Sequence, residues 1–268
     1  RSADDWPLYR HDPLLSGVAG TVVPARLEQV WRAPIGGRLT QPVIGGGKVL
    51  LASVDEGTVY ALDENSGAVA WRYVAGSRVD SPPAIYQGMA LVGSADGRVT
   101  CLRLADGELV WRFFAAPADL RTVAYDQVES LWPVHGSVLV LDGLAYFSAG
   151  RSTWLDGGIQ LYALNPATGD VVHHARFESA HPEFQEGKSG ARPEHETRID
   201  QNTTDYKTFL APPLSDSFSM AGGTVSDVLV SDGQNVFLHQ VKFNAKLEKQ
   251  EKMSRHLFST SSLLDDAE

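Results

Sequence analysis

The sequence predicts an all-β fold, a β-propeller of four-stranded blades that is incomplete or open. Three observations lead to this prediction. Tryptophan recurs at a constant interval of 40 residues, at Trp31, Trp71 and Trp111. Short β-branched or alternating apolar runs lie between glycine-containing turns, and helical periodicity is absent from this region. Four short strands in roughly 40 residues are typical of one propeller blade.

The two clearest repeats define the strands in order. In the first we expect strands at 49–54, 58–63 and 68–73, separated by turns that contain Gly57 and Gly67. In the second we expect strands at 89–94, 98–103 and 108–113, separated by turns that contain Gly97 and Gly107. A further copy reads Leu161-Tyr162-Ala163-Leu164 and then Gly169, with His173 at the tryptophan position. The matching phrases make the repeat more than an even spacing of tryptophans.

Interruptions of the repeat set the domain organisation. Residues 115–131 are an insertion, after which strands are expected at 138–140 and 144–149, followed by an enlarged loop at 150–158. Such loops are where a propeller would build a site. We divide the chain into an N-terminal segment that joins the propeller (1–24), propeller blades (25–178), a polar, partly disordered insertion (179–224), and a further blade hairpin with a truncated polar tail (225–268). That hairpin is expected at 225–230 and 235–241.

Composition excludes several functional classes. The net charge of −10 argues against a nucleic-acid partner, because phosphate binding needs clustered Lys and Arg. No apolar run is long enough for a transmembrane helix. The single cysteine, Cys101, excludes an intramolecular disulfide and an all-cysteine metal site. Because the chain begins at Arg1, we expect a processed product or a fragment, with any export signal outside this sequence.

A family resemblance rests on the repeat itself. The phrase Tyr60-Ala61-Leu62-Asp63, followed by Gly67 and Trp71, resembles the tryptophan-docking repeat of pyrroloquinoline-quinone-like (PQQ-like) propellers. That group includes quinoprotein alcohol dehydrogenases and the non-enzymatic propeller lipoprotein of outer-membrane barrel assembly. Residues 5–12 resemble the first segment of such propellers in large exported bacterial proteins, especially those of planctomycetes. The resemblance specifies the fold but not the function, because one architecture hosts unrelated activities.

Candidate ligand-binding residues lie in the segments that lead into each blade, because these segments converge on the propeller axis. The approaches 37–42 and 77–82 are one repeat apart, and 129–133 aligns with them on proline. We expect one mouth of the central channel to be lined by Arg38, Arg78, Asp80, Glu129, Trp132 and His135. Two guanidiniums near a carboxylate would bind a small anionic or sugar-like ligand, with Trp132 as a stacking floor. Alternatively, these charges pair with one another and join the blades.

Other candidate residues have structural explanations. An indole between blades buries about 150–250 Å² and can donate its N–H to a neighbouring carbonyl. We therefore predict blade docking, not cofactor stacking, for Trp31, Trp71 and Trp111. His173 and His174 are adjacent, so on a strand they point to opposite faces and cannot bind one metal together. No catalytic residue and no metal site are predicted.

The sequence favours a non-catalytic binding scaffold in an exported bacterial protein, with another protein or a fused domain as its partner. Two alternatives remain: a PQQ-dependent oxidoreductase, and a ligand-recognition domain fused to an enzyme. Resemblance to the quinoprotein dehydrogenases implies calcium and a vicinal cysteine pair over the quinone, and the single Cys101 cannot form that pair. We therefore expect no cofactor. The resemblance also implies a periplasmic or other extracytoplasmic location.

Overall fold

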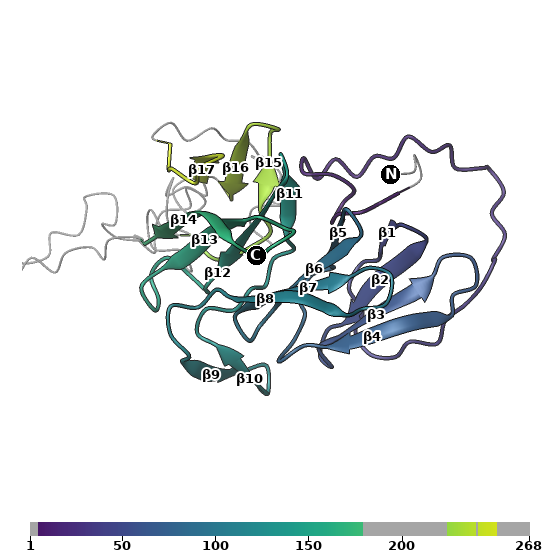
Figure 1. The fold of residues 1–268 in the computed structure, drawn as a ribbon, viewed down its shortest axis with the longest axis horizontal. Helices are drawn as coiled ribbons and strands as arrows, with labels where there is room; N and C mark the ends of the chain where they lie inside the picture. The colour runs from purple at the N-terminus through teal and green to yellow at the C-terminus, as the bar shows by residue number, and fades with distance from the viewer. Residues whose placement is uncertain (1–4, 179–223, 240, 251–268) are drawn as a thin grey trace, which may run out of the picture.

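The structure, a computed structural model, describes residues 5–178, 224–239 and 241–250. Within these residues the regular elements are all β-strands, and the antiparallel sheets follow one another around an open arc (Figure 1). The first blade contains β1 (Val43–Gly45), β2 (Lys48–Ser53), β3 (Thr58–Asp63) and β4 (Val69–Val74). The second contains β5 (Ala84–Tyr86), β6 (Met89–Ser94), β7 (Arg98–Arg103) and β8 (Leu109–Phe114). The third contains β11 (Leu139–Leu141), β12 (Leu144–Ala149), β13 (Ile159–Leu164) and β14 (Val171–Phe177). The predicted propeller fold is confirmed.

Two smaller sheets depart from the expected strands. The insertion between the second and third blades contains a hairpin of β9 (Arg121–Ala124) and β10 (Gln127–Ser130). The last described sheet contains β15 (Val230–Ser231), β16 (Asn235–Leu238) and β17 (Val241–Asn244).

The expected strand 225–230 is wrong, because Thr224 and Ser226 instead exchange backbone hydrogen bonds with the enlarged loop at Arg151 and Thr153. The expected strand 235–241 begins at Asn235, as predicted, but ends early. It divides at His239, whose φ of 50° turns the chain between β16 and β17. Of the predicted polar insertion, 179–223 lies outside the described residues.

The three complete blades share one strand register. Their third and fourth strands pair Ala61 with Trp71, Cys101 with Trp111, and Ala163 with His173. A register shift follows each of these pairs at the next residue of the third strand. His173 therefore occupies the position that tryptophan holds in the first two blades.

The repeated indoles contact the following blade in the same way. The indole Nε1 donates to a turn carbonyl oxygen of that blade, from Trp31 to Glu64 at 2.8 Å, from Trp71 to Leu104 at 2.9 Å, and from Trp111 to Pro166 at 2.9 Å. Each ring also covers a turn glycine. A Cβ added there would lie 2.4 Å from the ring at Gly67, 2.7 Å at Gly107 and 2.7 Å at Gly169. The glycines of the repeat thus make room for the tryptophans.

Apolar clusters fill the spaces between neighbouring sheets. Val43, Leu50 and Val59 of the first blade pack with Val92 and Leu102 of the second. Corresponding clusters join the second blade to the third, and the third to the β15–β17 sheet. Because the second and third blades bury both faces against neighbouring sheets, they position their connecting loops rigidly.

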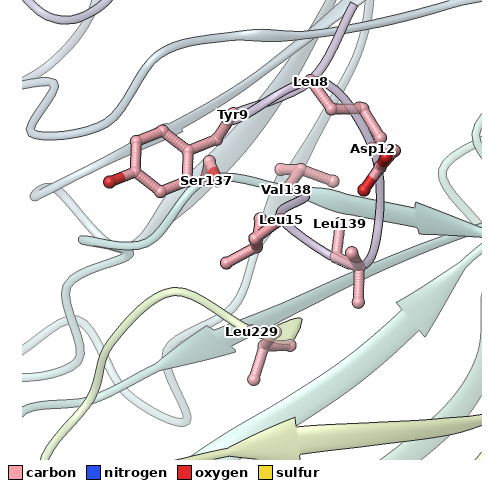
Figure 2. A pocket seen from close by; sticks show the side chains of 8 residues that line it. All are labelled: Leu8, Tyr9, Asp12, Leu15, Ser137, Val138, Leu139 and Leu229. Atoms are coloured by element: carbon pink, nitrogen blue, oxygen red, sulfur yellow. The ribbon is translucent and has the colours of Figure 1, made fainter. Parts of the chain in front are cut away.

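The N-terminal segment, residues 5–17, lies along the inner strands of the blades. Trp6 exchanges two backbone hydrogen bonds of 2.8 Å with Ile44 of β1, and the carbonyl of Pro7 accepts one of 2.7 Å from Ile85 of β5. The carbonyl of Pro13 accepts another, of 2.8 Å, from Ser231 of β15. Figure 2 shows residues of this segment against β11 and Leu229, around a space of about 10 Å³. That space holds at most one water, so this seam is packing and not a ligand site.

Candidate functional site

A buried ion-pair network stands at the approaches to the second and third blades. Arg78 is 2% exposed and Glu129 is 3% exposed. The Arg78 Nη2 lies 3.0 Å from Oε2 of Glu129, although the N–H is poorly aligned with that oxygen. The same guanidinium donates from Nε to Oδ1 of Asp80 at 3.1 Å and from Nη2 to Oδ2 at 3.4 Å. One arginine therefore joins carboxylates that come from two different approaches.

His135 extends this network from the third blade. Its Nδ1 lies 2.7 Å from Oδ2 of Asp80, and its backbone carbonyl accepts a 2.6 Å hydrogen bond from the Ser81 hydroxyl. Burial raises the pKa of Asp80, but the hydrogen bonds from His135 and Arg78 outweigh it, so the pKa lies below its usual value. Asp80 is thus held as a carboxylate between two donors.

Arg78 also supports the β9–β10 hairpin. Its Nη1 donates to the carbonyl of Ala124 at 3.4 Å, and its guanidinium lies 4.5 Å from the centre of the Tyr125 ring. The Ser77 hydroxyl donates to the carbonyl of Val128 at 3.0 Å, and Gln127 Nε2 donates to that of Asp55 at 2.7 Å. The hairpin is therefore held over the first two blades by side-chain to backbone hydrogen bonds.

Two of the six predicted mouth residues lie outside the network. Arg38 pairs with Asp55 at 2.8 Å, and both side chains are more than half exposed. Trp132 is 6% exposed and packs in the apolar cluster between the second and third blades. The structure thus brings together Arg78, Asp80, Glu129 and His135 in one group of ion pairs. A ligand-binding role for the six residues stays a prediction.

The outward side of the hairpin is apolar. Val123 and Val128 are cross-strand neighbours, and they are 72% and 56% exposed. Tyr125, at the tip, is 79% exposed, and Leu120 beside the hairpin is 52% exposed. Sequence reasoning identified 115–131 as an insertion but missed this patch. The signal available in the sequence was the pair of apolar residues, Val123 and Val128, on either side of Tyr125-Asp126.

Comparison with known proteins decides the family. A sequence profile of the family described as outer membrane protein assembly factor BamB matches residues 18–211. The chain belongs to the BamB family.

Individual relatives cover less of the chain. The BamB protein of Yersinia pestis is 30% identical over 134 residues, which are 47% of this chain and 33% of that protein. The BamB protein of Bordetella pertussis is 27% identical over 142 residues, which are 53% of this chain and 32% of that protein. This BamB-family chain therefore aligns with about a third of the length of these relatives.

Solved structures show partial overlap. BamB from Moraxella catarrhalis is 21% identical, with a TM-score of 0.44, and the overlap covers 78% of this chain and 46% of that one. Quinohemoprotein alcohol dehydrogenase ADHIIG from Pseudomonas putida HK5 is 16% identical, with a TM-score of 0.49, and the overlap covers 65% of this chain and 27% of that one.

The residues of this BamB-family chain do not fit pyrroloquinoline quinone at the described mouth. The quinone is a tricarboxylate, so a site for it needs available cations. Arg78 is already shared between Asp80 and Glu129, and Arg38 pairs with Asp55 away from them. Within the described ranges no cluster of three metal-ligating residues occurs, and no helix has the length and apolarity to span a membrane.

Cys101 is a buried residue of β7. Its side chain has no exposed surface, and burial raises the pKa of the thiol to about 12. Because the thiolate is the reactive form, we predict that a thiol reagent leaves the native protein unlabelled at neutral pH and labels one equivalent in denaturant. The absorbance of the chromophore that the reagent releases measures the number of labelled thiols. Rapid labelling without denaturant would show that β7 opens or that the thiol is accessible.

Proposed function

We propose that this BamB-family chain is a non-catalytic interaction scaffold of an exported bacterial protein. Family membership supports the scaffold, since the relatives are named outer membrane protein assembly factors. The names of the same relatives support an extracytoplasmic location. The proposal covers the chain in hand, which aligns with only a part of their length.

The observation that carries the proposal is the braced apolar hairpin. Val123, Tyr125 and Val128 stand out from a two-stranded sheet whose turn is held by the buried Arg78. A rigid support lowers the entropy lost when a partner binds. Clustered apolar side chains on a polar protein mark protein contacts. We therefore propose that the hairpin docks a protein partner that offers an apolar surface.

The quinone alternative has weaker support. It would need an anion site, whereas the mouth arginines are satisfied by Asp55, Asp80 and Glu129. Dye reduction after the chain is supplied with pyrroloquinoline quinone and calcium would contradict the non-catalytic proposal.

A photo-reactive residue at position 123 tests the docking surface in the native cells. We expect it to cross-link to one discrete partner, and the same reagent at Val69 to give none. Val69 is 53% exposed on β4 of the first blade, away from the hairpin.

A charge substitution gives the quantitative test with the purified partner. Val128→Asp should weaken its binding by about tenfold or more, because a buried unpaired charge disfavours an apolar interface. Val69→Asp is the matched control. The free energy of unfolding of both variants should lie within about 0.5 kcal/mol of the parent value. Equal binding by the two variants would contradict the proposal.

A further inference from the structure

A second candidate site lies at the opposite end of the first two blades. A cleft of about 620 Å³ is bounded by the N-terminal segment and by the β1–β2, β3–β4 and β5–β6 turns. Small-molecule sites have volumes of about 300–1,000 Å³. Strand β2 runs from Lys48, next to this cleft, to Ser53, near the turn that contacts the hairpin. The cleft is therefore separate from the channel mouth and from the proposed docking surface.

Long-range hydrogen bonds hold the walls of this cleft in place. The paired backbone bonds between Trp6 and Ile44 attach the N-terminal segment to the first blade. The bond from Ile85 to Pro7 attaches it to the second blade. The Leu104 N–H donates to the carbonyl of Gly88 at 2.8 Å and so fixes the β5–β6 turn. The cleft is thus formed before any ligand arrives, which reduces the cost of binding.

The floor of the cleft is apolar, and the glycine turns at its edge leave backbone groups uncovered. Pro7, Leu8, Ile85, Leu104 and Val140 line it. Gly47 and Gly88 also line it, and a Cβ added at either would meet no atom within 4 Å. Backbone groups are therefore accessible beside an apolar surface, which suits a ligand with a hydrocarbon body.

The charged groups of the cleft are acidic. Asp5 and Glu64 line it, and its described lining includes no lysine, arginine or histidine. The backbone of Glu64 is fixed on both sides, since its N–H donates to Gly47 at 3.2 Å and its carbonyl accepts from the Trp31 indole at 2.8 Å. No described residue forms an ion pair with the Glu64 carboxylate. Glu64 is thus positioned to receive a cation from a ligand.

We propose that this cleft binds an alkylammonium group, either as a free amine or as the side chain of a lysine. The hydrocarbon stem would lie on the Leu8, Ile85 and Leu104 floor, and the ammonium head would reach Glu64. Charge-assisted hydrogen bonds to a carboxylate are stronger than neutral ones, so the head sets the specificity. The Glu64 carboxylate disfavours an acidic ligand of the same length.

Titration of the ¹⁵N-labelled chain with hexylammonium tests the proposal. We expect saturable shifts at the backbone amides of Gly47 and Gly88, and none with hexanoate. Glu64→Gln should weaken binding by about tenfold. Glu56→Gln, in the β2–β3 turn at the other end of the first blade, should leave it unchanged. A blocked Leu-Lys-Leu peptide distinguishes the sources: tighter binding than hexylammonium assigns a lysine side chain, and weaker binding assigns a free amine.

Three results would overturn the proposal. They are no saturable shift with either amine, equal binding of hexanoate, and equal affinity of the Glu64→Gln and Glu56→Gln variants. Glu64→Gln changes an exposed side chain and keeps its backbone bonds, so the variant should fold normally. Failure here would leave the hairpin docking surface untouched, because the two sites share no residue.

Discussion

Replacing Arg78 by alanine is expected to lower the free energy of unfolding by about 3–5 kcal/mol. Glu129 is 3% exposed, and removal of the arginine would leave its carboxylate buried without a cation. Asp80 would keep His135 as a donor, so most of the loss should come from Glu129. Urea denaturation followed by circular dichroism measures the change.

The Arg38→Ala variant is the matched control. Arg38 lies one repeat before Arg78, but its pair with Asp55 is more than half exposed, so its removal should cost less than about 1 kcal/mol. A second variant, Arg78→Met with Glu129→Leu, replaces the buried pair by apolar groups and should recover most of the stability. Equal costs for Arg78→Ala and Arg38→Ala would show that the network contributes no more than a surface pair.

The hairpin should respond to the same substitution. Arg78 contacts both the Ala124 carbonyl and the Tyr125 ring. Without it, the hairpin should open more often, and trypsin should cleave after Arg121 faster than in the Arg38→Ala variant. Partner docking at the hairpin should weaken as well, although no docking residue is changed. Unchanged cleavage would mean that the hydrogen bonds of Ser77 and Gln127 suffice to hold the hairpin.

The repeated blades were predictable because their signals are local. Alternation and turn glycines placed strands at 58–63, 89–94, 98–103 and 144–149, where the structure has β3, β6, β7 and β12. The hairpin β9–β10 was missed because its turn residues, Tyr125 and Asp126, both have positive φ. Such turns usually carry asparagine or glycine, so this pair gave no turn signal.

The candidate site was only partly predictable, since its partners depend on differences between repeats. Arg38 and Arg78 hold equivalent backbone positions, as their carbonyls accept from Val54 and Ala95. The first blade places Asp55 beside Arg38, whereas the equivalent Asp96 of the second blade pairs with Arg98. Arg78 therefore pairs with Asp80 and with Glu129. The alkylammonium cleft depends on the docking of the N-terminal segment, which no local pattern reveals.

Replacing Trp71 by alanine should also destabilise the chain by about 3–5 kcal/mol, because the indole lies between two blades. Its side chain is 8% exposed, packs between the first and second blades, and donates to the Leu104 carbonyl at 2.9 Å. Trp31→Ala should cost less, since Trp31 is more exposed. Urea denaturation followed by circular dichroism gives both values. Equal or negligible costs would contradict a docking role for the repeated tryptophans.

A double-mutant cycle of Trp71→Ala and Gly107→Ala separates the contact between the indole and the glycine from the simple loss of buried apolar area. A Cβ at Gly107 would lie 2.7 Å from the Trp71 ring, in a backbone with φ of 76°. Gly88 has the same φ with no neighbour within 4 Å, so Gly88→Ala measures the backbone strain alone, about 1–2 kcal/mol. In the parent chain, Gly107→Ala should lower the free energy of unfolding by clearly more than Gly88→Ala does. When Trp71 is already alanine, it should lower it only by the backbone strain. Because residues in contact are coupled, the two changes should not add. Additive costs would place the indole away from the glycine and so remove the basis for the repeated packing of the blades.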